Sequence, residues 1–152
     1  MTTTVSSVAE LQDLVGKHLG YSAWWEISQE RIAKFADATD DHQWIHLDAA
    51  RAAAGPFGTT IAHGYLTLSL LVPMWHDILE FEGLRLGVNY GLNKVRFPSP
   101  VPVGSRIRAG ATLVSVEAVA DGSVQAVVDF IVEREGGGKP CCVAQGIYRF
   151  YV

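Results

Sequence analysis

Ionisable side chains are concentrated between Asp40 and His46, in the segment DDHQWIH. Asp41 and His46 are close in sequence and are separated in part by the apolar residues Trp44 and Ile45. Apolar neighbours lower the local dielectric, which moves the pKa values of a carboxylate and an imidazole toward neutrality. Such a pair is suited to hold one water molecule and to shuttle its protons. The spacing equally fits a loop outside regular structure, with a capping Asp and a solvated His, so spacing alone leaves both interpretations open.

A second candidate site precedes the most apolar segment of the chain. It consists of Ile61, Ala62, His63 and Gly64, directly after two threonines. A helix that begins here exposes unpaired N–H groups and a partial positive charge. Aimed at a carbonyl oxygen that gains charge, such donors form an oxyanion hole, and Gly64 lets a substrate approach the backbone closely. By itself the segment is also typical of an ordinary junction between a loop and a helix.

Helix signals surround these two segments. Ser7-Val8-Ala9-Glu10 matches a capping box and predicts a short helix that Gly20 ends, followed by a strand over residues 21–27. Ser28 is expected to cap a second helix, which ends in the polar residues before Asp41. Asp48 is expected to cap a small alanine-rich helix.

The second half of the chain has a different pattern. Gly64–Phe81 is apolar on nearly every side, which predicts one long enclosed helix with a kink at Pro73. The residues after Gly83 alternate in polarity, and Asp121-Gly122 indicates a tight hairpin. The predicted strands are Leu84–Phe97, Ser105–Val119, Val124–Val132 and a last strand through Tyr148 and Phe150. The order of elements predicts an α+β fold in which an antiparallel sheet wraps around a central helix.

Length and composition limit the function classes. The 152 residues, 49% of them hydrophobic, fit one domain spanning residues 1–152 and exclude a disordered chain. The net charge of −4 makes nucleic acid and anionic membranes unsuitable partners for the whole protein. The two cysteines are neighbours and form no zinc-binding spacing. Without a signal-peptide pattern or an apolar segment long enough to cross a bilayer, we expect a cytoplasmic protein.

Three segments, in this order, resemble the MaoC-like, (R)-specific enoyl-CoA hydratases (hydratase 2). DDHQWIH resembles the family signature G-D-x-N-P-[LIV]-H, and IAHGY resembles the segment that opens the central helix. KVRFPSPVPVGSRI resembles a strand motif in which Arg-Phe precedes Pro-Val and a Gly. The resemblance covers residues 28–108 and implies a single hot-dog domain.

The resemblance implies roles for particular residues. Asp41 and His46 match the family's catalytic pair, and an acyl thioester is expected to lie across Ile61–Gly64 with its carbonyl at the Gly64 N–H. The chain departs from the signature at Asp40, which replaces a Gly, and at Gln43-Trp44, which replace Asn-Pro. The offset to His46 favours Asp41 over Asp40 as the base.

The implied reaction is the reversible addition of water to a trans-2-enoyl-CoA, which gives a (3R)-3-hydroxyacyl-CoA. Asp41 takes a proton from the attacking water, and His46 orients that water and helps deliver a proton at C2. The Gly64 amide stabilises enolate charge on the thioester oxygen. No metal and no separate cofactor is expected, since coenzyme A is part of the substrate. Hot-dog domains usually pair through a sheet edge, so we also expect a homodimer.

Further residues have two interpretations each. Asn89 and Tyr90 either line the acyl channel or are ordinary strand residues. His42 and His46, with Asp41 and His63 nearby, are acceptable metal ligands, but the loop does not secure the helical spacing that a shared ion requires. The basic residues that either bind coenzyme A phosphates or form a solvated face are Lys94, Arg96, Arg106 and Arg108.

Two other functions fit the same fold. A hot-dog thioesterase shares the acyl-thioester pocket but hydrolyses the thioester, and it is distinguished by release of a free thiol. A non-catalytic subunit that binds acyl thioesters is the alternative from another class. That alternative predicts that Asp41 and His46 lie far apart.

Overall fold

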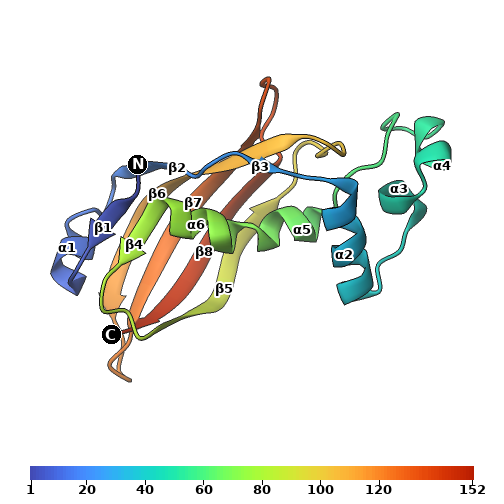
Figure 1. Ribbon diagram of the computed structural model, residues 1–152. Coiled ribbons are helices and arrows are strands. Elements are labelled where there is room, and N and C mark those ends of the chain that lie inside the picture. Colours follow the sequence, from blue (N-terminus) through green and yellow to red (C-terminus); the bar gives the residue numbers. More distant parts are fainter.

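A twisted antiparallel sheet of six strands forms the framework of the computed structural model, which describes residues 1–152 (Figure 1). Its main path has the order β2-β6-β7-β8-β5. The short strand β3 also pairs with β6, nearer the start of β6 than β2 does. The strands of this sheet are β2 (His18–Tyr21), β3 (Trp25–Glu26), β5 (Leu86–Arg96), β6 (Arg106–Ala118), β7 (Val124–Arg134) and β8 (Cys142–Tyr151).

The alternation predicted for β7 is present in the structure. Val128, Phe130 and Val132 are buried, whereas Asp129 and Ile131 point to the opposite, exposed face. Because side chains alternate between the faces of a strand, every second apolar residue packs into one core. The hairpin between β6 and β7 turns at Gly122, whose φ of +83° suits a glycine.

Two helices lie across the apolar face of the sheet, α5 (Gly64–Ser69) and α6 (Leu71–Ile78) (Figure 1). Leu66, Met74, Trp75 and Ile78 are buried on these helices and belong to the main hydrophobic core with residues of β6, β7 and β8. This arrangement of a sheet around central helices is the α+β fold that the sequence predicts.

The prediction of one helix over Gly64–Phe81 is wrong in detail. The helix is divided at Leu70, and its last residues form the short strand β4 (Leu79–Phe81), which pairs in parallel with β1 (Thr3–Val5). Pro73 has no N–H to donate to the carbonyl of Ser69, the last residue of α5, so the two helices separate at this point.

Three helices gather beyond the α5 end of the central helices: α2 (Gln29–Thr39), α3 (Trp44–Leu47) and α4 (Ala49–Ala53) (Figure 1). Both predicted caps are confirmed. The Ser28 side chain accepts a hydrogen bond from the Arg31 N–H, and Asp48 accepts one from the Arg51 N–H, at 3.1 and 3.0 Å.

The first helix, α1 (Val8–Gln12), is shorter than the sequence predicts. Ser7 caps it by accepting from the Glu10 N–H at 3.1 Å, but Gly20 does not end it. The chain leaves the helix through Gly16, whose φ is +84°, and Gly20 lies inside β2. The strand predicted over residues 21–27 is also interrupted, because only Tyr21 at its start and β3 later in it have strand pairing.

None of the helices combines the length and the apolar character that crossing a bilayer demands.

Candidate active site

A left-handed turn at the end of α2 sets the direction of Asp41. Asp40 has φ 58° and ψ 23° and is the one non-glycine residue of the structure with positive φ. Glycine adopts such angles at little cost, whereas most other residues do not. The left-handed turn explains why the family signature has Gly at this position. The Asp40 side chain that stands there in this protein is exposed.

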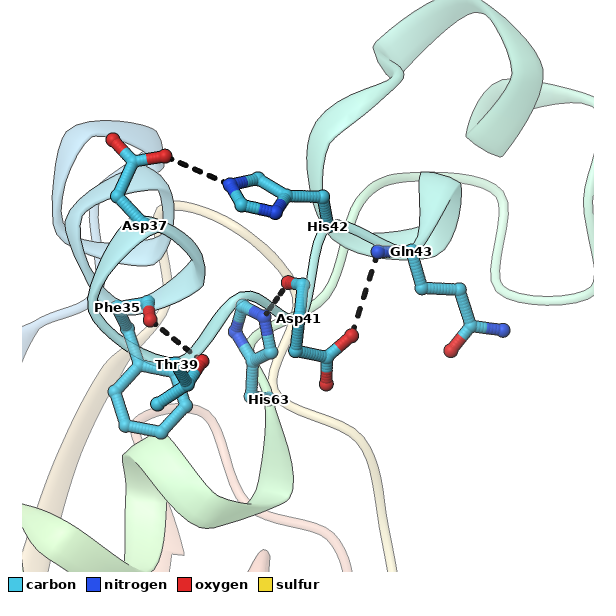
Figure 2. A network of polar contacts seen from close by, with 7 residues as sticks. All are labelled: Phe35, Asp37, Thr39, Asp41, His42, Gln43 and His63. Carbon is cyan, nitrogen blue, oxygen red and sulfur yellow. Dashed lines mark hydrogen bonds and ion pairs between the residues drawn. The ribbon is translucent and has the colours of Figure 1, made fainter.

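Asp41 is held through its main chain and leaves its carboxylate accessible (Figure 2). Its carbonyl oxygen accepts a hydrogen bond from His63 Nε2 at 3.0 Å. One carboxylate oxygen lies 3.4 Å from the backbone nitrogen of Gln43, which donates to it. The second carboxylate oxygen has no such protein donor in the structure, so the side chain can accept a hydrogen bond from a water or a substrate.

His46 lies in the short helix α3, so the expectation that it stands outside regular structure is wrong. Its side chain is 6% exposed, and Nδ1 donates to the carbonyl oxygen of Ile61 at 2.7 Å. Since a carbonyl only accepts, the neutral ring keeps a lone pair on Nε2. Burial lowers the pKa of His46, and His63 lowers it further, while the Ile61 carbonyl and Asp41 act in the opposite direction. His46 is therefore a neutral imidazole at physiological pH.

Asp41, His46 and His63 converge in space. One polar side-chain atom from each lies within 4.8 Å of the corresponding atoms of the other two. The imidazole rings of His46 and His63 are stacked, with centroids 3.7 Å apart and planes inclined by 21°. The in-plane lone pairs of the two stacked rings therefore lie in two nearly parallel planes, which is a poor arrangement for two ligands of one ion.

His42 does not join this group. Its Nε2 lies 2.9 Å from a carboxylate oxygen of Asp37 on α2, and Figure 2 shows the ring turned away from the Asp41 carboxylate. The hydrogen bond with Asp37 raises the pKa of this exposed imidazole. The pair of ligands that the sequence offers at His42 and His46 is therefore not formed.

A half-buried amide connects the two segments of the site and was not predicted from the sequence. Gln29, the first residue of α2, donates to the carbonyl oxygen of His46 at 2.8 Å. The same amide accepts a hydrogen bond at 2.7 Å from Thr60, which is buried. Gln29 thus fixes α3 against the segment before α5. Its sequence position, one residue after a helix cap, gives no signal of this role.

The segment that precedes α5 is anchored on both sides. Ile61 donates to the carbonyl of Ile45 at 3.0 Å, and Ala62 donates to that of Val101 at 2.8 Å. Gly64 is the first residue of α5, so its N–H has no acceptor within the helix. A Cβ at this position would lie 3.1 Å from ring carbons of Phe97, which leaves room only for a glycine unless that ring moves.

A cavity of about 440 Å³ lies against this segment. Its walls are mainly apolar and include His46. They also include Ile61, Ala62 and Gly64, three of the four residues of the second candidate site that the sequence predicts. The lining residues are Ile45, His46, Phe57, Ile61, Ala62, Gly64, Thr67, Phe97, Pro98, Ser99, Pro100, Val101 and Cys141. His63 lies behind this wall, stacked on His46.

The comparison with protein families identifies the chain's relatives. A family model described as "MaoC like domain" matches residues 10–134. The chain belongs to the MaoC-like dehydratase family. The family, the fold and the dehydratase class that the sequence implied are thereby confirmed.

Individual relatives of this MaoC-like chain agree with the assignment. A protein of Mycobacterium tuberculosis named 3-hydroxyacyl-thioester dehydratase Z is 57% identical over 147 residues, which cover 97% of each chain. Nodulation protein N of Rhizobium meliloti is 43% identical over 143 residues, 93% of this chain and 89% of that protein. The solved structure of the R-hydratase PhaJ1 from Pseudomonas aeruginosa has a TM-score of 0.71 and 26% identity, and the match covers 93% and 83% of the two chains.

Asn89 and Tyr90 do not lie at the cavity beside His46. Both are on β5, and both line another depression, between that strand and the central helices, which Leu68, Val72 and Tyr148 also line. Within one copy of this MaoC-like chain, the structure does not bring these two residues together with Asp41 and His46.

The four basic residues considered for coenzyme A are also separated. Lys94 and Arg96 lie on β5, whereas Arg106 and Arg108 lie on β6, and β7 and β8 run between these strands. Glu135 pairs with Arg106 at 3.1 Å, and Glu133 pairs with Arg108. The four residues therefore form no single phosphate-binding group in one chain.

Proposed function

We propose that this chain catalyses the reversible, (R)-specific hydration of trans-2-enoyl-CoA thioesters to (3R)-3-hydroxyacyl-CoA thioesters. The observation that carries the proposal is the placement of Asp41 and His46, whose polar atoms lie within 4.8 Å of each other. His46 also lines an apolar cavity next to Gly64, a suitable place for an acyl thioester. The relative named 3-hydroxyacyl-thioester dehydratase Z supports the same reaction class.

The two side chains have complementary roles with a water molecule. The neutral His46 ring accepts a hydrogen bond at Nε2, which orients the water, and the Asp41 carboxylate takes a proton as the water oxygen bonds to C3. The π electrons of the C2–C3 bond move toward the thioester carbonyl and form an enolate. A proton returned from the acid–base pair to C2 restores the carbonyl, so water is added overall and the pair regains its starting state.

The Gly64 N–H supplies the third part of this mechanism. Enolate charge develops on the thioester oxygen, and a donor at the start of a helix stabilises that charge. The segment that carries Gly64 is held by backbone hydrogen bonds at Ile61 and Ala62, so the donor is oriented before the substrate binds.

The experiment is a hydration assay across enoyl-CoA chain lengths, followed by determination of the configuration at C3. We expect loss of the enoyl absorbance, a 3R product and no free thiol. Thiol release without hydration would replace the proposal by a thioesterase, and binding without turnover would replace it by a non-catalytic subunit. The short distance between Asp41 and His46 gives that last alternative no support.

We also propose that the reaction needs no metal and no further cofactor, because each proton transfer is assigned to a side chain. Full hydration activity after treatment with a chelator is expected. Loss of activity on chelation, restored by one divalent ion, would contradict this part of the proposal.

A homodimer is the proposed functional state. β5 is an edge strand that pairs only with β8, and its outer side leaves backbone groups free for another strand. It also carries exposed apolar side chains, which are Leu86, Val88, Tyr90 and Leu92. Pairing of β5 with β5 of a second copy would cover them and extend the sheet.

A further inference from the structure

His63 contacts both members of the proposed catalytic pair. Its Nε2 donates a hydrogen bond to the carbonyl oxygen of Asp41 at 3.0 Å, which Figure 2 shows from close by. Its ring is stacked on that of His46, with a centroid distance of 3.7 Å. A single imidazole therefore contacts both the main chain of the proposed base and the ring of its partner.

The His63 ring is itself held in place. It is 3% exposed and packs against two rings, that of His46 and that of Phe35, whose centroid is 4.8 Å away. The residue also directly precedes α5, and its carbonyl oxygen accepts hydrogen bonds from Leu66 and Thr67 of that helix at 3.1 and 3.2 Å. Because the ring and the backbone are both fixed, His63 is a rigid support.

A polar atom on this ring argues against a purely packing role. Nδ1 of His63 is buried and has no hydrogen-bond partner. Leaving a buried polar group unpaired costs about 1–3 kcal/mol. An apolar ring would fill the same space without that cost but would have no N–H for the Asp41 carbonyl. The contact at Nε2 is thus the feature that distinguishes histidine from phenylalanine at this position.

We propose that His63 is a positioning residue for the hydration reaction: its Nε2–H fixes the Asp41 main chain, and its ring supports that of His46. This inference rests on the proposed function, since it assigns a role within that reaction. His63 itself does not line the cavity, so it acts through Asp41 and His46 and not on the substrate.

The stacking also bears on the charge of His46. Two imidazolium rings at this distance repel each other, so His63 adds to the effect of burial in lowering the pKa of His46. The other groups around His46 are the Asp41 carboxylate, the Ile61 carbonyl, the Gln29 amide and Cys141, whose thiol stays uncharged because burial raises its pKa. Removing the His63 imidazole should therefore make His46 easier to protonate.

The test compares His63→Phe with wild type in steady-state hydration assays over a range of pH. We expect kcat to fall roughly 10- to 100-fold with little change in KM, because the catalytic pair loses its alignment. The acid limb of the kcat profile should move to higher pH, because His46 becomes easier to protonate. A kcat within about threefold of wild type, with the acid limb unmoved, would overturn the proposal.

Phe35→Leu is the matched control, since Phe35 packs against the His63 ring and makes no polar contact with Asp41 or His46. We expect it to lower the melting temperature and to leave the acid limb in place. An equal shift of the acid limb in Phe35→Leu would show that general loosening causes the effect, and would also overturn the proposal.

His63→Gln is the variant to measure if His63→Phe does not fold. It keeps an N–H donor but lacks the ring, so the acid limb should move while kcat falls less, and an unmoved limb would contradict the inference. NMR titration of the His46 ring separates this result from failure of the proposed function. A rise in the His46 pKa in the variant supports the contact even if wild type hydrates no enoyl-CoA, and an unchanged His46 pKa overturns it.

Discussion

Asp40 and Asp41 are consecutive in the chain but differ in what surrounds them. Asp40 has a left-handed backbone that ends α2, and its φ is 58°. The Asp41 carbonyl is bound by His63 at 3.0 Å, and its carboxylate lies within 4.8 Å of a ring nitrogen of His46. The geometry places the chain reversal at Asp40, and the proposed function assigns proton transfer to Asp41.

Replacing Asp41 with Asn should reduce kcat for hydration by ~10²–10⁴-fold, because an amide cannot take the proton from water. The side chain is exposed, so the melting temperature should change little. Asp40→Asn is the matched control and should stay within a few fold of wild type. A larger loss in Asp40→Asn than in Asp41→Asn would reverse the assignment of the base.

Asp40→Gly should stabilise the protein by about 0.5–1 kcal/mol. Glycine relieves the left-handed backbone, and the substitution removes a negative charge from the C-terminal end of α2, where the helix dipole disfavours it. The free energy of unfolding in urea measures the effect. Asp40→Ala removes the charge but keeps the unfavourable backbone, so it should be less stable than Asp40→Gly. Equal stability of these two variants would show that the backbone angle contributes nothing.

Local signals in the sequence were the most reliable guides to the fold. The caps at Ser28 and Asp48 act over three residues, and the alternation in β7 needs only neighbouring positions. The kink expected at Pro73 corresponds to the division of the central helix, but the strand β4 at the end of that helix was not predicted, because β4 forms by pairing with β1. That pairing joins Thr3 to Leu79, which are remote in the chain, and nothing local indicates it.

The site shows the same division between near and distant contacts. Asp41 and His46 belong to one short motif, so the sequence predicts their proximity. Gln29 and Thr60 are 31 residues apart and meet only because α2 packs beside the segment before α5. Asn89 was associated with the site by its place on a strand, although residue types on a strand do not reveal which depression they line.

Gly64→Val should lower turnover by ~10²–10³-fold if the Gly64 N–H stabilises the enolate. The new side chain meets Phe97, since even a Cβ would lie 3.1 Å from that ring, and it displaces the thioester carbonyl. Phe97 is partly exposed and can rotate away, so we expect the protein to remain folded. The checks are kcat and the melting temperature.

Phe97→Leu is the control for Gly64→Val, because it alters the same wall of the cavity and leaves the N–H accessible. It should change KM more than kcat. Near-normal turnover in folded Gly64→Val would contradict the oxyanion role. If Gly64→Val does not fold, the double variant Gly64→Ala with Phe97→Leu relieves the contact with the ring but still adds a methyl group beside the N–H, so its turnover should fall below that of Phe97→Leu alone.

Activity should persist into mildly acidic solution. Burial holds the pKa of His46 below its usual value of about 6.5, so the neutral ring that orients water is retained as the pH falls to that value. The acid limb of kcat/KM should therefore lie below roughly pH 6.5. An acid limb near pH 7 or above would show that His46 is not held neutral.

The same shift should make stability depend on pH. The unfolded chain protonates His46 at a higher pH than the folded chain does, so the contribution of His46 is complete above the unfolded pKa. It is lost as the pH falls from there through the lower folded pKa. His46→Gln should remove this slope from the free energy of unfolding, and taking the difference from wild type cancels the opposite effect of His42.

Dimer formation should depend on the outer edge of β5. Val88 and Leu92 are 44% and 47% exposed in a single chain, so the folded monomer does not need them. In a symmetric pairing, lysines at these positions approach their copies, and like charges placed together cost several kcal/mol. We expect wild type to be a dimer in light scattering at micromolar concentration and Val88→Lys/Leu92→Lys to be a folded monomer.

Ile131→Lys is the control, because Ile131 is 53% exposed but lies on β7 inside the sheet, and it should leave the dimer intact. A monomeric wild type would refute the dimer, and dissociation by Ile131→Lys alone would move the interface to the outer face of the sheet.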